Sequence, residues 1–198
     1  MNKSIDYGLP PFRQYSRSLH GNVGGDIIIW RVSMLQVSRV IDFCAGHRLM
    51  NYSGNCKFIH GHNFKAVIHV KDSVVNKAGM VIDFNDIRET VKTYIDTTWD
   101  HGFFVNYYDR DMVEFLRQND QKFFMLVPER MFSLHGYSLG DGSFIKEHGV
   151  ALCNPTVENL SLLLEAEAVR LLEPYFISSA PGIQAQIYES ENGWVTTL

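Results

Sequence analysis

Alternation of side chains over residues 58–70 is the feature that most restricts how this chain can fold. One set of alternate positions is apolar: Phe64, Ala66, Ile68 and Val70, set against Lys65, Val67 and His69. A period of two predicts a β-strand with one buried face. His60 and His62 share the parity of the apolar set. If the strand extends back to them, both imidazoles point to the buried side.

Two other segments have the helical period. In residues 85–98 the apolar side chains fall on one face of a helix, and Asp83 or Asn85 can cap the start of that helix. Residues 157–172 carry a wide apolar stripe formed by Leu160, Leu163, Leu164, Ala168, Leu171 and Leu172. Thr156 is a suitable N-cap and Pro174 a stop signal. We therefore predict two helices.

The remaining segments complete an α+β pattern. Residues 27–45 suit one or two strands, and residues 183–189 alternate as a final strand. Within the long segment 107–153 we expect a short helix near Met112–Leu116, a strand over 122–127 and an extended loop over 132–149. Strands, helix, insertion, helix and strand in this order indicate an α+β fold with antiparallel pairing.

Composition limits the partners. The 198 residues are 45% hydrophobic and 20% charged, with a formal net charge of −4. This predicts one domain over residues 34–198, preceded by an extension over residues 1–33. No basic stripe indicates nucleic-acid binding, and no apolar run is long enough to span a bilayer. Three cysteines and no signal-peptide pattern favour a reducing, cytoplasmic location.

The candidate chemistry is concentrated in residues 43–63. His60 and His62 would project together from one strand, and His47 on a neighbouring strand would complete a face of three imidazoles. Three neutral imidazoles with an open fourth position are typical of catalytic zinc. Cys56 is open to three interpretations: a fourth ligand that closes the site, a thiolate that acts as base or nucleophile, or a buried structural cysteine.

Other polar residues have both a functional and a structural interpretation. Asp100 and His101 follow the first helix; they form either a proton-transfer pair or a solvated helix end. Glu189 has the inward parity of the last strand, so it either meets a ligand's N–H groups or lies beyond the strand in solvent. We expect Cys44 in the core and Cys153 beside a loop, both chemically inert.

Six motifs in order resemble the 6-pyruvoyltetrahydropterin synthase and 6-carboxytetrahydropterin synthase family. They are Phe43–Leu49, Cys56–Asn63, Gly79–Phe84, Asp100–His101, Asn154–Asn159 and Tyr188–Glu189. The resemblance covers roughly Met34 to Glu189 apart from the insertion. It implies the tunnelling fold, in which an antiparallel four-stranded sheet carries two helices on one face. It also implies an oligomeric barrel, commonly a homohexamer with sites at subunit interfaces.

The resemblance implies a role for each matching residue. His47, His60 and His62 correspond to the zinc ligands, and Cys56, Asp100 and His101 correspond to the catalytic proton-transfer set. Glu189 corresponds to the carboxylate that anchors the pterin ring, and Thr156 falls in a motif near the pterin. The substrate of such a zinc-dependent lyase would be a pterin triphosphate.

The spacing Cys56-x3-His60 resembles the bacterial 6-carboxytetrahydropterin synthases of queuosine-precursor synthesis. We therefore expect conversion of 7,8-dihydroneopterin triphosphate to 6-carboxy-5,6,7,8-tetrahydropterin. The alternatives are the 6-pyruvoyltetrahydropterin synthase reaction and a non-catalytic zinc- or pterin-binding homologue. The chain departs from the family pattern in its N-terminal extension, at Cys44, in the insertion near 131–150 and in the sequence 190–194.

Overall fold

The computed structural model of the chain describes residues 30–138 and 142–198. Its elements in chain order are β1 (Trp30–His47), η1 (Asn55–Lys57), β2 (His60–Val75), α1 (Phe84–Ile87), η2 (Arg88–Lys92), α2 (Thr93–Thr98), β3 (Gly102–Asn106), α3 (Arg110–Gln118), β4 (Phe123–Leu126), α4 (Pro128–Leu134), α5 (Gly142–Leu152), α6 (Val157–Leu172), η3 (Glu173–Tyr175), β5 (Gly182–Ser190) and β6 (Gly193–Thr196). Most of the expected extension over residues 1–33 lies outside the described residues. Strand β1 already begins at Trp30.

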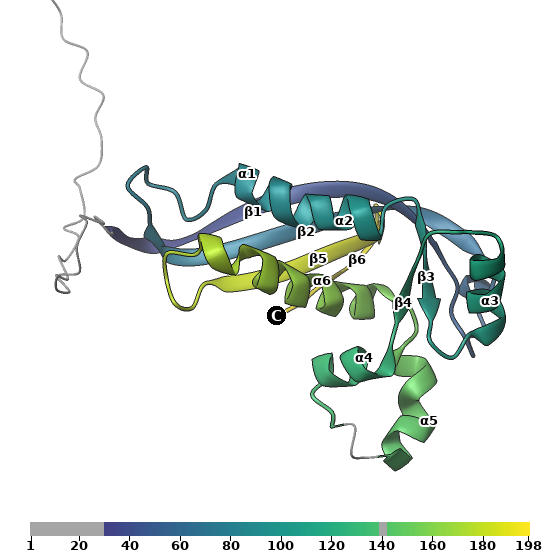
Figure 1. Ribbon diagram of the computed structural model, residues 1–198. Helices are drawn as coiled ribbons and strands as arrows, with labels where there is room; N and C mark the ends of the chain where they lie inside the picture. Colours follow the sequence, from purple (N-terminus) through teal and green to yellow (C-terminus); the bar gives the residue numbers. More distant parts are fainter. Residues whose placement is uncertain (1–29, 139–141) are drawn as a thin grey trace, which may run out of the picture.

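The strands form one curled, mixed sheet in the order β4-β3-β1-β2-β5-β6 (Figure 1). β1, β2, β5 and β6 pair antiparallel, as expected for the four-stranded core. The prediction of four strands was wrong, because β3 and β4 extend the sheet to six by parallel pairing beside the end of β1. Their apolar runs are short and lack alternation, so the sequence period did not reveal β3.

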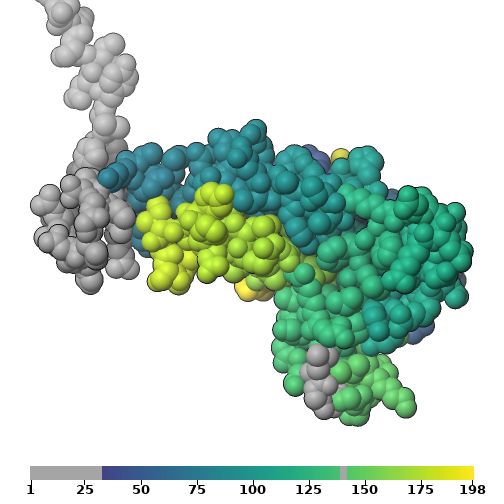
Figure 2. Space-filling model, in the orientation of Figure 1, coloured from purple at the N-terminus to yellow at the C-terminus, as the bar shows by residue number. Residues whose placement is uncertain are grey.

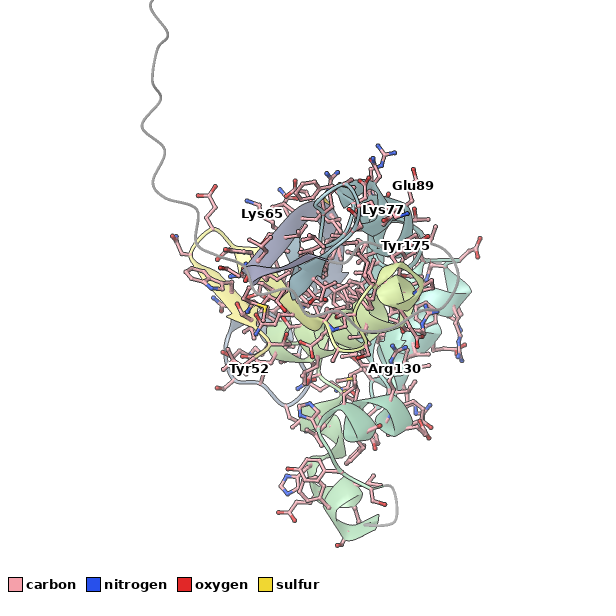
Figure 3. All side chains as sticks on the ribbon, turned by 90° about the vertical axis from the view of Figure 1, so that its left-hand side faces the viewer. Tyr52, Lys65, Lys77, Glu89, Arg130 and Tyr175 are labelled. Atoms are coloured by element: carbon pink, nitrogen blue, oxygen red, sulfur yellow. The ribbon has the colours of Figure 1, made fainter. Side chains whose placement is uncertain are left out.

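Helices cover one face of the sheet. Viewed from the end, the sheet and the helix layer are distinct, and Lys65 lies on the sheet side away from the helices (Figure 3). The alternate residues of β2 are buried against these helices, which confirms the period-two prediction; they are Phe64, Ala66, Ile68 and Val70. His60 and His62 share this parity, so they also face the helix side.

Both predicted helices are confirmed. Thr156 caps α6 by accepting a hydrogen bond from the backbone N–H of Asn159 at 3.4 Å. Asp83 caps α1, and its Oδ1 lies 2.8 Å from the backbone nitrogen of Asn85. The first helix is not uniform, because its central turn, η2, is π-helical. Such a turn adds one residue to the helical repeat and is not visible in a 3.6-residue periodicity.

The expected loop over 132–149 is wrong: α4 and α5 occupy much of this segment. Its glycines suggested turns, but Gly149 lies inside α5. A Cβ atom there would come within 2.5 Å of the Tyr108 hydroxyl, so glycine lets α5 pack closely against the side chain of Tyr108. The α4–α5 pair projects from the body of the molecule (Figure 2). The expected short helix and strand correspond to α3 and β4.

A buried carboxylate joins α4 to α6. Glu167 of α6 pairs with Arg130 of α4, which lies at the base of the projecting pair (Figure 3), and with Arg170 at 2.7 Å. Burial alone would raise the pKa of Glu167, but the hydrogen bonds and charges of the two arginines outweigh it and lower the pKa. The ionised form is therefore favoured in the folded protein.

Replacing Glu167 by glutamine should lower the free energy of unfolding at pH 7 by about 1–3 kcal/mol, the scale of charge-assisted hydrogen bonds. Because the folded-state pKa is depressed, the carboxylate's contribution is complete above the unfolded pKa of about 4.3. It is lost as pH falls through the lower, folded-state value. Urea unfolding across this acid range should show a flatter pH dependence for Glu167→Gln. Glu191→Gln, at an exposed carboxyl, is the matched control, and an equal change in both variants would contradict the assignment.

Candidate metal centre and its surroundings

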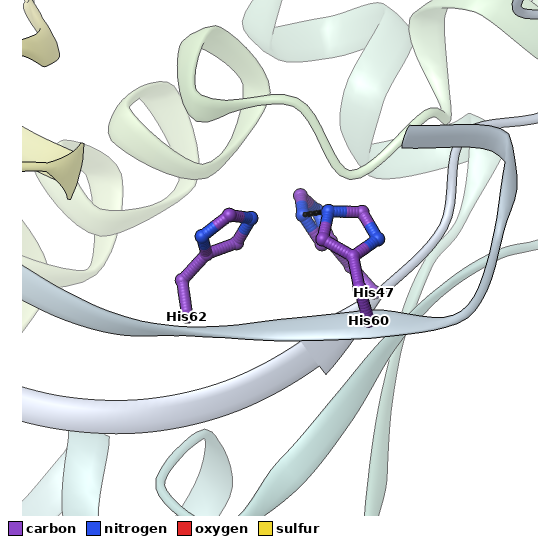
Figure 4. A group of neighbouring side chains, drawn as sticks. All are labelled: His47, His60 and His62. Carbon is purple, nitrogen blue, oxygen red and sulfur yellow. Dashed lines mark hydrogen bonds between the residues drawn. The ribbon is translucent and has the colours of Figure 1, made fainter. Parts of the chain in front are cut away.

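Three histidines meet where β1 ends and β2 begins (Figure 4). His47 is opposite His60 in the antiparallel register, and His62 is two residues further along β2. One ring nitrogen from each histidine lies within 4.8 Å of the others. His47 is 1% exposed, while His60 and His62 are half-buried. The expected convergence of the three imidazoles is therefore confirmed.

Hydrogen bonds fix which nitrogens face one another. His47 Nδ1 lies 2.8 Å from the carbonyl oxygen of Pro155, and His60 Nδ1 lies 2.8 Å from that of Phe58. A carbonyl only accepts, so each Nδ1 carries a proton and each Nε2 of the neutral ring presents a lone pair. The two Nε2 atoms are 3.1 Å apart. No hydrogen bond joins two lone pairs, so an additional positive centre would stabilise this arrangement.

A zinc ion fits these donors. Two nitrogens about 2.0–2.1 Å from one tetrahedral zinc would lie about 3.3 Å apart, close to the 3.1 Å that separates the Nε2 atoms of His47 and His60. His62 Nε2 is buried and has no hydrogen-bond partner. Metal-binding histidines usually donate their other ring N–H to a backbone carbonyl or a carboxylate, which fixes the tautomer and the ring orientation. His47, His60 and His62 thus have the donor set of a metal centre.

Burial favours the neutral form of two of the imidazoles. Burial lowers the pKa of His47, although its hydrogen bond to Pro155 and the nearby Glu189 carboxylate act in the opposite direction. Burial likewise lowers the pKa of His62. Only the neutral ring can coordinate a metal ion. His47 and His62 therefore favour the form that binds a cation.

Glu189 lies beside the histidines. Its Oε1 is 3.3 Å from His47 Nε2 and 3.7 Å from His62 Nε2. Strand β5 continues to Ser190, so the interpretation that the strand ends at Tyr188 is wrong. The side chain of Glu189 is 30% exposed and so remains accessible to a ligand. The inward parity expected from the alternation of β5 explains this placement.

The cysteines occupy three different environments. Cys56 is half-buried in η1, and over residues 30–138 and 142–198 the group able to hold a metal consists of the three histidines without it. Cys44 was expected in the core, which is wrong: it is exposed and its Sγ lies 3.1 Å from Asn63 Oδ1. It has the opposite parity to the buried Phe43. Cys153 is buried, which raises its pKa to about 12 and makes it unreactive.

Asp100 and His101 form a hydrogen-bonded pair beside β1, just before β3. His101 Nδ1 lies 2.8 Å from Asp100 Oδ2, and Asp100 Oδ1 accepts from the backbone N–H of Cys44 at 2.8 Å. Burial acts to raise the pKa of Asp100, but these hydrogen bonds lower it. The imidazole is 81% exposed. It lines a depression whose other lining residues include Cys44, Gly46, Gly61, His62 and Asn63.

The depression touches the metal centre at one residue, because His62 is among its lining residues. Cys44 and Gly46 alternate along β1 with Ala45 and His47, and only the latter two face the helices. His101 shares the depression with Cys44 and Gly46, whose positions in β1 alternate with those that face the helices. Within one chain Glu189 contacts His47 and His62, whereas over residues 30–138 and 142–198 no hydrogen bond or ion pair joins Asp100 or His101 to the three histidines.

Sequence reasoning missed the groups that hold the histidines. The acceptors for His47 and His60 are the backbone carbonyls of Pro155 and Phe58. A backbone carbonyl exists at every residue, so no residue type indicates this role. The only sequence signal was the position of Pro155 beside Thr156, which lies in the cap of α6.

The fold and this site define an α+β protein with a three-histidine candidate metal centre at the end of a curled sheet. The sequence model of the family described as 6-pyruvoyl tetrahydropterin synthase matches residues 36–198, so the chain belongs to that family. This confirms the resemblance noted in the sequence. Among the described residues, no helix combines the length and apolar character that a membrane span needs.

Two relatives found by sequence comparison are named 6-carboxy-5,6,7,8-tetrahydropterin synthase. The chain is 27% identical over 165 residues to the 6-carboxy-5,6,7,8-tetrahydropterin synthase of Rickettsia typhi, an alignment covering 82% of this chain and 99% of that protein. It is 33% identical over 73 residues to the protein of the same name from Haemophilus influenzae, covering 35% and 52%.

Solved structures named 6-pyruvoyl tetrahydropterin synthase share the fold. The Caenorhabditis elegans structure has a TM-score of 0.52 at 19% identity, covering 85% of this chain and 97% of its own. The Plasmodium vivax structure has a TM-score of 0.55 at 13% identity, covering 83% and 97%.

Proposed function

We propose that this chain is a zinc-dependent lyase that converts 7,8-dihydroneopterin triphosphate to 6-carboxy-5,6,7,8-tetrahydropterin, a precursor of queuosine. The zinc part of this proposal rests on the convergence of His47, His60 and His62, in which the buried Nε2 of His62 has no hydrogen-bond partner. When bound, zinc would act as a Lewis acid toward substrate hydroxyl oxygens. The names of the relatives from Rickettsia typhi and Haemophilus influenzae support the pterin reaction.

The chain's own residues supply binding and proton transfer. Glu189, beside the histidines and partly exposed, would accept hydrogen bonds from the amino and ring N–H groups of the pterin. Thr156 would lie at the edge of the same site, next to Pro155. Cys56 as thiolate would remove a proton from the substrate side chain, and His101, held in one tautomer by Asp100, would return one. Triphosphate would then leave, and a water molecule would cleave the carbon–carbon bond of the remaining side chain: its oxygen enters the carboxylate retained on the ring, and the released two-carbon fragment is acetaldehyde.

The placement of these groups supports an oligomer. The three histidine rings gather in one group, whereas Asp100 and His101 lie beside Cys44 at the edge of β1. A second copy of the chain would place its own Asp100 and His101 beside these histidines. We therefore propose a homo-oligomer, a hexameric barrel, with each site at a subunit interface. We also propose a cytoplasmic location. We propose one domain over residues 34–198, preceded by an extension over residues 1–33 and carrying an insertion within residues 107–153.

Anaerobic incubation of zinc-loaded protein with 7,8-dihydroneopterin triphosphate tests the reaction. We expect 6-carboxytetrahydropterin and acetaldehyde by mass spectrometry, and loss of both products after zinc is removed with a chelator. Formation of 6-pyruvoyltetrahydropterin would instead assign the reaction named for the C. elegans and P. vivax proteins. A zinc-bound protein without turnover would identify a non-catalytic binding module and contradict the proposed lyase.

A further inference from the structure

The carbonyl that orients His47 is itself held by an asparagine. Pro155 O accepts the hydrogen bond from His47 Nδ1, and the preceding residue is Asn154. The side chain of Asn154 pairs twice with the backbone of Met50: Oδ1 accepts from Met50 N at 2.9 Å, and Nδ2 donates to Met50 O at 2.9 Å. Met50 follows His47 by three residues. Asn154 therefore joins the chain that carries His47 to the turn that carries its acceptor.

A second asparagine anchors the same turn to the insertion. Asn106, at the end of β3, is 1% exposed. Its Nδ2 donates to Asn154 Oδ1 and to the carbonyl of Val150 in α5, both at 2.8 Å. Its Oδ1 accepts from the backbone N–H of Tyr108 at 3.0 Å. The amide group of Asn106 is thus bonded at both ends and cannot rotate without losing several buried hydrogen bonds.

A third asparagine completes the arrangement. Asn159 Nδ2 donates to the carbonyls of Asn154 at 2.7 Å and Leu152 at 3.0 Å. Its Oδ1 accepts from His135 Nε2 at 2.7 Å. His135 directly follows α4, in the part of the insertion that was expected to be a loop. The insertion therefore reaches the turn that precedes α6 by three routes: Val150, Leu152 and His135.

We propose that Asn154 is a positioning residue for His47, and that the insertion, through Asn106 and through His135 and Asn159, holds Asn154 in place. This inference rests on the proposed zinc site. Metal-binding histidines depend on the partner of their other ring nitrogen for orientation and tautomer. Here that partner is a backbone carbonyl, so its position depends on whatever fixes the backbone. Asn154 has both the acceptor and the donor that the Met50 backbone requires. Aspartate would lack the donor, and leucine would lack both.

The first test measures zinc affinity by competition with a chromophoric chelator. Asn154→Ala should raise the zinc dissociation constant about tenfold, the lower end of the effect of removing a group that orients a metal ligand. Asn154→Asp keeps the acceptor and should lie between this variant and the wild type. Asn76→Ala is the matched control: Asn76 Oδ1 also accepts two backbone N–H groups, those of Ala78 and Met80. Asn76 follows the end of β2 far from His60, so its loss should leave zinc affinity unchanged.

The second test reads the tautomer of His47 in the zinc-free protein. Nitrogen-15 NMR of histidine-labelled protein should show His47 protonated at Nδ1 in the wild type and in Asn76→Ala. Asn154→Ala should show a mixture of tautomers, because the turn that carries the Pro155 carbonyl loses the side-chain hydrogen bonds that tie it to Met50 and Asn106. A loss of stability alone would not change the tautomer of a folded chain. This readout therefore separates positioning from a general structural role.

The insertion's part is tested at His135, outside the packed turn. His135→Leu removes the donor to Asn159 Oδ1 and should weaken zinc binding, whereas His135→Gln, whose amide N–H can replace Nε2–H, should restore it. These variants also test the inference if Asn154→Ala fails to fold. Equal zinc affinity and an unchanged His47 tautomer across all these variants would overturn this inference and leave the proposed function standing. A wild-type protein that binds no zinc would overturn it together with the proposed function.

Discussion

Replacing Cys56 with alanine should lower turnover about 10²–10⁴-fold, the usual contribution of a positioned acid–base group, while bound zinc stays at the wild-type level. The three histidines form the candidate metal group without the thiol of Cys56, so the variant keeps every proposed ligand. The measurements are product formation from 7,8-dihydroneopterin triphosphate and zinc content by atomic absorption on the same samples.

Cys44→Ala is the matched control for this experiment. Cys44 is also an accessible thiol, but it lies on the face of the ladder that carries His101 and is bonded to Asn63. Its removal should leave turnover near the wild-type value. Loss of zinc from Cys56→Ala would mean that Cys56 is a ligand. Loss of turnover in Cys44→Ala with full activity in Cys56→Ala would assign the catalytic thiol to Cys44.

Mixing two inactive variants should restore activity. Cys56→Ala and His101→Asn should each be nearly inactive as pure proteins. If one site takes Cys56 from one copy and His101 from another, subunits mixed equally should recover about a quarter of wild-type activity, since symmetric assembly distributes the copies at random. Asparagine is chosen because His101 has φ = 56°, a left-handed conformation that asparagine tolerates and alanine does not.

The control for the mixing experiment is a pair of variants within one candidate centre. The mixture contains His60→Ala and Cys56→Ala. Cys56 lies in η1 just before β2, and His60 is the first residue of β2. If both belong to the same half-site, no mixed oligomer contains an additional intact site, and activity should stay at the level of the pure variants. Failure of Cys56→Ala and His101→Asn to complement would contradict the shared site and leave a site within one chain.

The local sequence determined the helices and strands in which buried and exposed positions recur at a regular spacing along the chain. The alternation in β2 and β5 fixed which residues face the helices, and with them the sides of His60, His62 and Glu189. The capping residue and apolar stripe of α6 gave a helix over residues 157–172, the bounds that the structure shows. These features depend on backbone geometry and a single buried face, so a few neighbouring residues contain the necessary information.

Tertiary structure decided the rest. Cys44 is exposed because its strand position faces away from the helices, although its residue type favours burial. β3 joins the sheet beside the last residues of β1 through hydrogen bonds between distant backbone groups. The same holds for the Pro155 carbonyl that orients His47 and for the asparagines around it. Backbone groups are common to all residue types, so the sequence could place the histidines together, but only the packed chain selected the partners that hold them.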